Sequence, residues 1–250
     1  MDESLPLRTL RLVVEYDGTG LAGWQRQDGQ PTVQGWLEQA FLAMTKQAVV
    51  VRGAGRTDAG VHADGQVASV EVASRIPALG FLRGLNTHLP PEIAVLEVTD
   101  MPAGFNARFD ARGKIYRYQV WNHPVRSPRF ARHVWHVYDP LDLHAMREAA
   151  AVLIGEHDFR AFRSADCDRK NTVRIIRRLD VRRDGALVSI EVEGTAFLRN
   201  MVRILAGTLV AVGKHKMSPA EVAAVLAAGD RTKAGITAPA CGLTMVKVIY

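Results

Sequence analysis

The feature that most constrains the fold of this chain is the order in which strand-like and helix-like segments follow one another. Leu10, Leu12 and Val14 occupy alternate positions along 7–16, which predicts a half-buried strand. Thr32 can cap a following helix whose apolar residues share one face. Three more strands, at 48–51, 66–72 and 93–98, and a helix starting near Pro77 give the order β-α-β-β-α-β.

The second half of the chain repeats this order more loosely. Asp184 and Gly185 predict a type I′ turn between two strands. Ser218 and Glu221 have the spacing of a capping box at the start of a helix. The predicted segments are strands at 113–121, 172–181, 186–193 and 243–249, and helices beginning at Leu143, Thr195 and Pro219.

Two split βαβ units in tandem are the architecture that this repeated order favours. We therefore predict an α+β fold of two ferredoxin-like lobes with joined antiparallel sheets. The segment 99–111 is expected to connect the halves. The first lobe, 1–104, then carries the polar loop described below, and the second, 105–250, carries most of the arginines.

Composition excludes several classes of protein. The 250 residues are 48% hydrophobic, which is too much for a mostly disordered chain. No apolar run approaches the roughly 20 residues needed to cross a bilayer, and the N-terminus lacks a signal-peptide pattern. Cys167 and Cys241 have no spacing typical of a metal site or a disulfide framework. We expect a cytoplasmic protein with reduced thiols and no contact with membranes.

The charge of the chain points to a polyanionic partner. The formal net charge is +6, with 32 lysines and arginines. Basic residues concentrate between Lys114 and Arg203, where arginine outnumbers lysine. Because guanidinium groups bind phosphate in a fork and stack on bases, this distribution favours a nucleic acid. The charge does not separate RNA from DNA.

The polar loop Gly55-Arg56-Thr57-Asp58-Ala59-Gly60-Val61-His62 lies between two predicted strands. Its small residues leave room for another molecule to approach Asp58 closely. This carboxylate is either a catalyst or a cap of its own turn. A metal site of Asp58, His62 and Asp64 is a weaker alternative, because the three residues lie in one loop without a second ligand cluster. His62 is expected to orient the loop or to contact a phosphate.

Aromatic residues beside arginines form a second group of candidates. Phe105 and Phe109 flank Asn106, Ala107 and Arg108, a pattern that suits base stacking but also suits anchoring a linker to the core. On the strand 113–121, alternation places Lys114, Tyr116 and Tyr118 on one face. Tyr116 can then stack on a base, or it can be an ordinary half-buried tyrosine.

Arginines form two further patterns. Arg199 and Arg203 are one turn apart in the predicted helix and would share a face, where an arginine could pair with a carboxylate. Along the predicted strand 172–181 and its extension, Arg174, Arg178 and Arg182 would share one face. Such a basic stripe is easier to explain by phosphate binding than by packing.

Motifs spread over nearly the whole chain resemble those of the tRNA pseudouridine synthase A family. The similarity rests on the order and spacing of these motifs, of which the loop around Asp58 is the most specific. The matching segments are Tyr16-Asp17-Gly18-Thr19, Gly23-Trp24-Gln25, Thr32-Val33-Gln34, Gly55 to Ala63, Phe105 to Phe109, Tyr116-Arg117-Tyr118 and Phe197 to Arg203.

The resemblance implies a pseudouridine synthase fold with RNA in a central basic cleft. It also implies the conversion of uridine to pseudouridine at positions 38, 39 and 40 of the anticodon arm of tRNA. Asp58 would be the nucleophile, Arg199 its ion-pair partner and Tyr116 the residue that holds the target uridine. A homodimer that uses no metal and no organic cofactor is expected.

The resemblance further implies a set of RNA-contacting residues. Arg56, Thr57 and His62 are expected to bind the substrate uridine. Two departures concern this set: the family often has histidine where this chain has Asn106, and glutamine is frequent where Asp168 stands. The expected tRNA contacts are Phe105, Asn106, Ala107, Arg108, Phe109, Asp166, Cys167, Asp168, Arg169, Lys170, Arg174, Arg178 and Arg203.

Two other classes of protein compete with this interpretation. A non-catalytic RNA-binding module would use the arginines and the aromatic residues, but it would not need a carboxylate in a loop of small residues. A metal-dependent hydrolase acting on nucleic acid would need more carboxylates or histidines near Asp58 than the spacing offers.

Overall fold

The computed structural model describes residues 5–165, 167 and 170–250, and it divides into two compact units. The first unit comprises Met1–Arg112 together with Met245–Tyr250, and the second comprises Gly113–Thr244. These bounds differ from the predicted lobes, 1–104 and 105–250, because the segment after residue 104 and the end of the chain both belong to the first unit.

Hydrogen bonds explain why the segment after residue 104 and the last strand belong to the first unit. The backbone N–H of Ala107 donates to Ser69 Oγ at 3.1 Å. The backbone N–H of Arg112 donates to Ile249 O at 2.8 Å. The linker and the last strand are therefore tied to the first unit.

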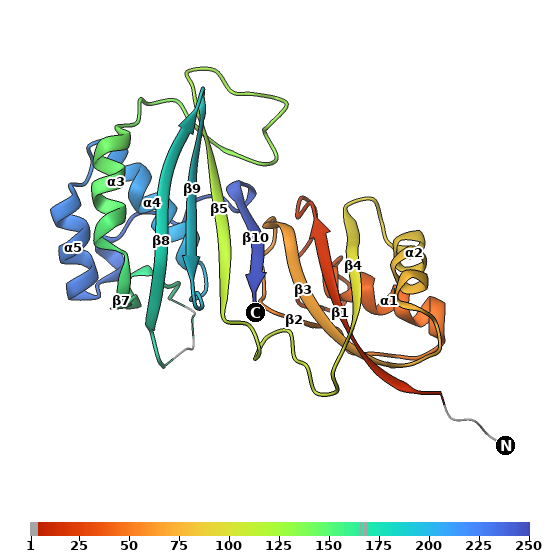
Figure 1. Cartoon of the computed structure of the whole chain (residues 1–250). Helices are drawn as coiled ribbons and strands as arrows, with labels where there is room; N and C mark the ends of the chain where they lie inside the picture. Colours follow the sequence, from red (N-terminus) through yellow and green to blue (C-terminus); the bar gives the residue numbers. More distant parts are fainter. Residues whose placement is uncertain (1–4, 166, 168–169) are drawn as a thin grey trace. The chain divides into compact units, whose positions relative to one another are not determined.

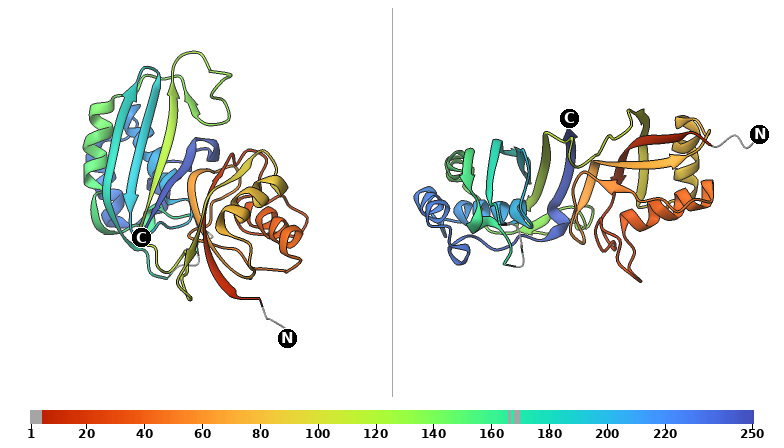
Figure 2. Two further views of the ribbon diagram at one scale, coloured as in Figure 1. Left: turned by 45° about the vertical axis from the view of Figure 1, so that its right-hand side comes forward. Right: turned by 90° about the horizontal axis from the view of Figure 1, so that it is seen from below.

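The first unit has the predicted order β-α-β-β-α-β, followed by a strand from the end of the chain. Its strands are antiparallel where β1 meets β3 and β4, and β10 lies next to β3. Figures 1 and 2 show the two helices together beside these strands. The elements are β1 (Leu7–Tyr16), α1 (Val33–Thr45), β2 (Arg52–Gly53), β3 (His62–Ala73), α2 (Ala78–His88), β4 (Ile93–Met101) and β10 (Leu243–Ile249).

Local signals account for helix α1. Thr32 is its N-cap, and the Thr32 hydroxyl accepts a hydrogen bond from Gly35 N, as predicted. Leu37 and Phe41 are fully buried on the predicted apolar face. The Phe41 ring packs on Phe81 of α2 at 5.5 Å between centroids, so the two helices share one core.

The strand predicted at 48–51 is wrong. These residues form no strand, and β2 is a two-residue strand that pairs with Ser69 and Ala68. The reason is a buried carboxylate on α1: Val51 N donates to Glu38 Oε1 at 3.1 Å. Because a side chain satisfies this backbone donor, the segment is held against the helix instead of joining the sheet.

The helices of the second unit pack along one side of a sheet, as Figure 1 shows. The antiparallel strand order is β5-β9-β8-β7, and β6 pairs with β5 in parallel. Its elements are β5 (Gly113–Asn122), β6 (Trp135–Val137), α3 (Leu143–Val152), β7 (Gly155–Asp158), β8 (Val173–Asp184), β9 (Leu187–Gly194), α4 (Met201–Gly213) and α5 (Pro219–Ala228).

The hairpin between β8 and β9 forms one residue later than predicted. Asp184 pairs with Leu187, so the turn consists of Gly185 and Ala186. Gly185 has a positive φ of 57°, and Ala186 is not among the residues with positive φ. A type I′ turn needs positive φ at both central residues, so the type I′ prediction is wrong.

Helix α4 begins later than predicted. The expected helix from Thr195 to Val212 starts only at Met201. Thr195 N still donates to Ile175 O, which prolongs the strand hydrogen bonding, and Asn200 takes a left-handed conformation with φ 60°. Arg199 therefore precedes the helix, and the predicted common helical face of Arg199 and Arg203 is wrong.

The predicted α+β class is confirmed, with multi-stranded and mostly antiparallel pairing. The capping box at Ser218 is also present, because Ser218 Oγ and the Glu221 carboxylate bond each other's backbone N–H groups. Among the described residues, no helix combines the length and the apolar character that a membrane span requires.

Candidate active site

The Asp58 loop joins β2 to β3 and lies against the segment that follows β1. Trp24 N donates to Thr57 O at 3.1 Å, and Gly60 N donates to Leu21 O at 3.3 Å. Val61 N donates to Asp58 O at 3.2 Å and closes the turn, while the Asp58 side chain is half-buried. The backbone of the loop is thus fixed on both sides of Asp58.

Two glycines make this close approach possible. A Cβ atom on Gly23, which has φ 90°, would lie 2.6 Å from Thr57 O. A Cβ atom on Gly18 would lie 2.1 Å from Val61 O. Any side chain at either position would push the loop away. In the sequence, the only sign of this packing role is that both glycines stand beside aromatic or acidic residues within the matching motifs.

A buried hydrogen bond lies under the loop. Tyr16 OH is 2.8 Å from Thr57 Oγ1. Burial raises the pKa of Tyr16 to about 12. Thr57, which was predicted to bind the substrate, therefore has its hydroxyl bonded to the end of β1, whereas Arg56 is exposed.

His62 connects the end of the loop to the residues after β1. Its Nδ1 accepts a hydrogen bond from Gly18 N at 3.0 Å and lies 3.2 Å from Asp17 Oδ1. This geometry agrees with the expectation that His62 orients the loop. Within the described part of the chain, the ligand atoms of Asp58, His62 and Asp64 do not converge, so the geometry does not favour a metal site made of these three residues.

Tyr116 lies on β5 in the second unit. The predicted alternation is confirmed, because Tyr116, Tyr118 and Val120 are all buried. The Tyr116 ring meets the Phe197 ring edge to face at 5.2 Å between centroids. Phe197 lies in the irregular segment before α4 and fixes the Tyr116 ring, a role that the sequence pattern does not indicate.

The two candidate arginines after β9 have different surroundings. Arg199 is exposed, and its backbone carbonyl accepts a hydrogen bond from Ser164 N at 3.2 Å. Arg203 is half-buried on the first turn of α4. Its Nε donates to Ala238 O at 2.7 Å, and its Nη1 donates to Asn200 Oδ1 at 2.9 Å. The guanidinium of Arg203 is therefore held in one orientation.

The segment Phe105 to Phe109 is anchored to the core at one end only. Ala107 is buried, and its carbonyl accepts a hydrogen bond from Tyr250 OH at 2.7 Å. Phe105 packs on the Tyr250 ring at 5.4 Å. Phe109, in contrast, is 79% exposed, with the Arg108 guanidinium 5.7 Å from its ring centroid. The segment is therefore anchored through Phe105 and Ala107, whereas Phe109 is exposed to solvent.

The predicted common face of Arg174, Arg178 and Arg182 is wrong. The pairing of β8 with β9 shifts between Ile176 and Arg178, because a bulge inserts one residue there. Arg174 therefore falls on the face of the buried Ile176. Arg178 and Arg182 fall on the opposite face of the strand.

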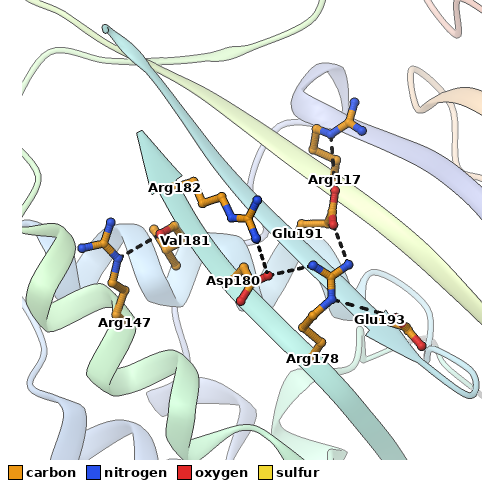
Figure 3. A network of polar contacts seen from close by, with 8 residues as sticks. All are labelled: Arg117, Arg147, Arg178, Asp180, Val181, Arg182, Glu191 and Glu193. Carbon is orange, nitrogen blue, oxygen red and sulfur yellow. Dashed lines mark hydrogen bonds and ion pairs between the residues drawn. The ribbon is translucent and has the colours of Figure 1, made fainter. Parts of the chain in front are cut away.

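Carboxylates on the same face surround these arginines, as Figure 3 shows. Arg178 lies 2.7 Å from Asp180 Oδ2 and 2.6 Å from Glu191 Oε1. Arg182 shares Asp180 at 3.3 Å, and Arg117 shares Glu191 at 3.7 Å. This face of the sheet is a network of alternating charges and not a purely basic stripe.

The remaining predicted contacts lie between β7 and β8. Cys167 is buried, and its carbonyl accepts a hydrogen bond from Arg163 Nη1 at 3.3 Å. Lys170 is exposed. Asp166, Asp168 and Arg169 lie outside the described residues.

Comparison with known proteins identifies the class of this chain. The family described as tRNA pseudouridine synthase matches residues 12–110 and 149–250. A tRNA pseudouridine synthase A of Pelobacter propionicus is 47% identical over 98% of this chain and 100% of the relative. The corresponding protein of Myxococcus xanthus is 49% identical over 96% of this chain and 91% of the relative, and that of Geotalea uraniireducens is 44% identical over 98% and 100%.

The chain is therefore an isomerase. It belongs to the tRNA pseudouridine synthase family. The predicted family and the predicted conversion of uridine to pseudouridine in tRNA are confirmed at this level.

Proposed function

We propose that this chain converts uridine to pseudouridine at positions 38, 39 and 40 of the anticodon stem-loop of tRNA, with Asp58 as the nucleophile. The observation that carries the proposal is the construction of the Asp58 loop. Its backbone is bonded to the segment after β1, and Gly18 and Gly23 allow that segment to approach. A carboxylate on such a support keeps one position, as a catalytic group must.

The reaction itself sets further requirements. The N1–C1′ bond breaks, the uracil rotates, and C5 joins C1′, so the detached base must stay in the site. Tyr116 suits the wall of such a pocket, because Phe197 fixes its ring. The ionised carboxylate of Asp58 can attack C1′, attack C6 of the uracil, or remove a sugar proton so that a glycal-like intermediate forms. All three routes use the same carboxylate.

A cation beside Asp58 would favour the charged form of its carboxylate and offset the cost of burying that charge under RNA. The resemblance assigns this role to Arg199. The structure of the second unit favours a second candidate, Arg203, because its guanidinium is half-buried and oriented by two hydrogen bonds. An exposed Arg199 suits contact with the RNA backbone.

Lysine substitutions distinguish the roles of these two arginines, because lysine keeps the positive charge but cannot form the two parallel hydrogen bonds that a guanidinium makes to a carboxylate. Single-turnover assays compare Arg199→Lys with Arg203→Lys. The arginine that pairs with Asp58 is identified by a rate that falls about 100-fold in its lysine variant while the affinity for tRNA is retained. If both variants keep the rate, neither arginine pairs with Asp58.

Of the other contacts that the resemblance implies, we propose those whose side chains are exposed and not held by carboxylates, which leaves out Arg178. Arg56, Arg108, Phe109 and Lys170 are exposed and can reach RNA, whereas Thr57 and Ala107 support the backbone around them. The rearrangement has no net oxidation or reduction, and we propose from the resemblance that it uses no metal and no organic cofactor. We expect the enzyme to act in the cytoplasm as a homodimer.

One experiment tests the function against its rivals. Unmodified tRNA is incubated with the enzyme in the presence and in the absence of EDTA, and pseudouridine is mapped by carbodiimide-dependent primer extension. We expect new stops in the anticodon arm with the wild type and with Asp64→Asn, and none with Asp58→Asn. Binding without modification would favour an RNA-binding module. Strand cleavage that is lost on chelation, and lost in both variants, would favour a metal-dependent hydrolase.

A further inference from the structure

The loop between β5 and β6, residues 123–134, is the most basic surface segment of the second unit that the proposed function leaves unused. No aspartate or glutamate occurs from Gly113 to Tyr138. Arg126, Arg129 and Arg132 recur at every third position of the loop. The segment therefore carries positive charge without any local compensation.

All three of these arginines are exposed. Among the described residues, none of them forms an ion pair. Arg178 on β8 differs from these arginines, because its guanidinium forms ion pairs with Asp180 and Glu191. An arginine without a carboxylate partner can bind a phosphate without first breaking an ion pair.

Hydrogen bonds and ring contacts hold the loop in a defined conformation. Trp121 Nε1 donates to Val125 O at 2.9 Å, and the Trp121 ring packs on Phe130 at 5.5 Å. A ring nitrogen of His136 is 2.8 Å from His123 O. Figure 1 shows the loop extending beyond the end of β5. Because its backbone is held at several points, the arginines are presented in a defined arrangement, which lowers the entropy cost of binding.

An aromatic ring lies among these charges. Phe130 is 38% exposed, and the Arg129 guanidinium lies 5.9 Å from its ring centroid. Exposed aromatic and guanidinium planes side by side are the groups on which unstacked RNA bases pack. The loop thus offers both phosphate and base contacts.

We infer that the loop 123–134 is a second RNA-binding element that grips the phosphate backbone of the substrate tRNA. Tyr116, the proposed base-binding residue, and Asn122 at the other end of β5 are six residues apart, which is about 20 Å along a strand. The loop therefore starts well away from Tyr116, and it returns to the sheet at Trp135, which pairs with Val120. It lies between the two ranges that match the family, 12–110 and 149–250. The inference rests on the proposed function only for the identity of the RNA.

The test is the salt dependence of tRNA binding by the full-length enzyme. The triple variant Arg126→Gln/Arg129→Gln/Arg132→Gln removes three exposed charges and should melt like the wild type. We expect its Kd for a tRNA transcript to rise about 10- to 50-fold at 0.15 M salt, and its slope of log K against log salt to flatten by about two to three units. The rate at saturating tRNA should not change.

A matched control removes the same charge elsewhere. The triple variant Arg177→Gln/Arg178→Gln/Arg182→Gln alters arginines that have carboxylate neighbours, and its slope should change by less than one unit. Equal flattening in both variants would mean that only net charge matters, which overturns the inference. An unchanged slope in the loop variant overturns the inference too. If light scattering shows that the loop variant no longer forms a dimer, the loop is an interface between copies of the chain, which also overturns the inference. Mapping of pseudouridine with the wild type tests the proposed function separately, because the loop is judged by binding alone.

Discussion

The hydroxyl group of Tyr16 lies 2.8 Å from Oγ1 of Thr57, so one buried hydrogen bond joins the end of β1 to the residue that precedes Asp58. The two side chains are 3% and 6% exposed. Since the pKa of Tyr16 is raised to about 12 by burial, this hydroxyl keeps its proton at neutral pH. The strand thereby fixes the backbone from which the Asp58 carboxylate extends.

Tyr16→Phe should therefore reduce kcat by about tenfold and leave the KM for tRNA unchanged, because it loosens the support of Asp58 without touching RNA. The free energy of unfolding should fall by about 1 kcal/mol, the usual contribution of one hydrogen bond. Steady-state kinetics and urea unfolding measure the two effects. Tyr118→Phe is the control: it loses a hydroxyl bonded to Pro239 O at 2.8 Å in the other unit and should keep the wild-type kcat. Equal kcat values for both variants would contradict the positioning role of Tyr16.

Two glycines that lie three residues apart in the first unit, Gly20 and Gly23, test the packing of the same loop. Gly20 and Gly23 both have positive φ, at 79° and 90°, but only Gly23 faces the backbone of Thr57. Gly20→Ala should lower the free energy of unfolding by about 1–2 kcal/mol, because alanine is strained in the left-handed conformation. Gly23→Ala should cost about 1–3 kcal/mol more because of the added collision, and it should also lower kcat. Chemical unfolding and assays at saturating tRNA compare them, and equal losses would mean that the loop moves aside at no cost.

The sequence predicted those parts of the fold whose cause is local. Strand β1 follows from alternation, and α1 and α5 begin at the capping residues Thr32 and Ser218. Loop composition and strand alternation, together with the family resemblance, indicate Asp58 and Tyr116 as candidate site residues. Signals of this kind act over a few residues, so a single sequence reveals them.

The errors in the prediction arise from contacts that are distant in the sequence or from a single backbone irregularity. The segment before β2 is not a strand because Glu38 binds Val51 N. Helix α4 starts late because Asn200 is left-handed, and the face of Arg174 changes because of the bulge in β8. The role of Gly23 depends on a tertiary approach to Thr57, which periodicity cannot reveal.

The acid stability of the second unit should depend on Asp158. Hydrogen bonds from Arg160, with a further one from Thr172, lower the pKa of this carboxyl to about 2. A lowered pKa means that the stabilisation is fully present above the ordinary value near 4 and is lost as pH falls through about 2. Asp158→Asn should be less stable than the wild type at pH 6 and similar to it at pH 2. Thermal melts across this range, with the exposed Glu156→Gln as control, check the effect, and a constant difference at all pH values would contradict it.

Arg178 should contribute to the stability of the second unit and little to RNA affinity, because its guanidinium is already bound to Asp180 and Glu191. Arg178→Ala leaves these carboxylates without their shared cation, and the expected loss is about 0.5–1 kcal/mol, since the network is partly exposed and screened by solvent. A double-mutant cycle with Glu191→Ala should give a coupling energy of similar size, because the two residues are in direct contact. The slope of tRNA affinity against salt should remain within one unit of the wild type. If the slope instead falls by a full unit and the coupling energy is zero, Arg178 releases its carboxylates to bind phosphate, and the network on this sheet face is a latent RNA-binding surface.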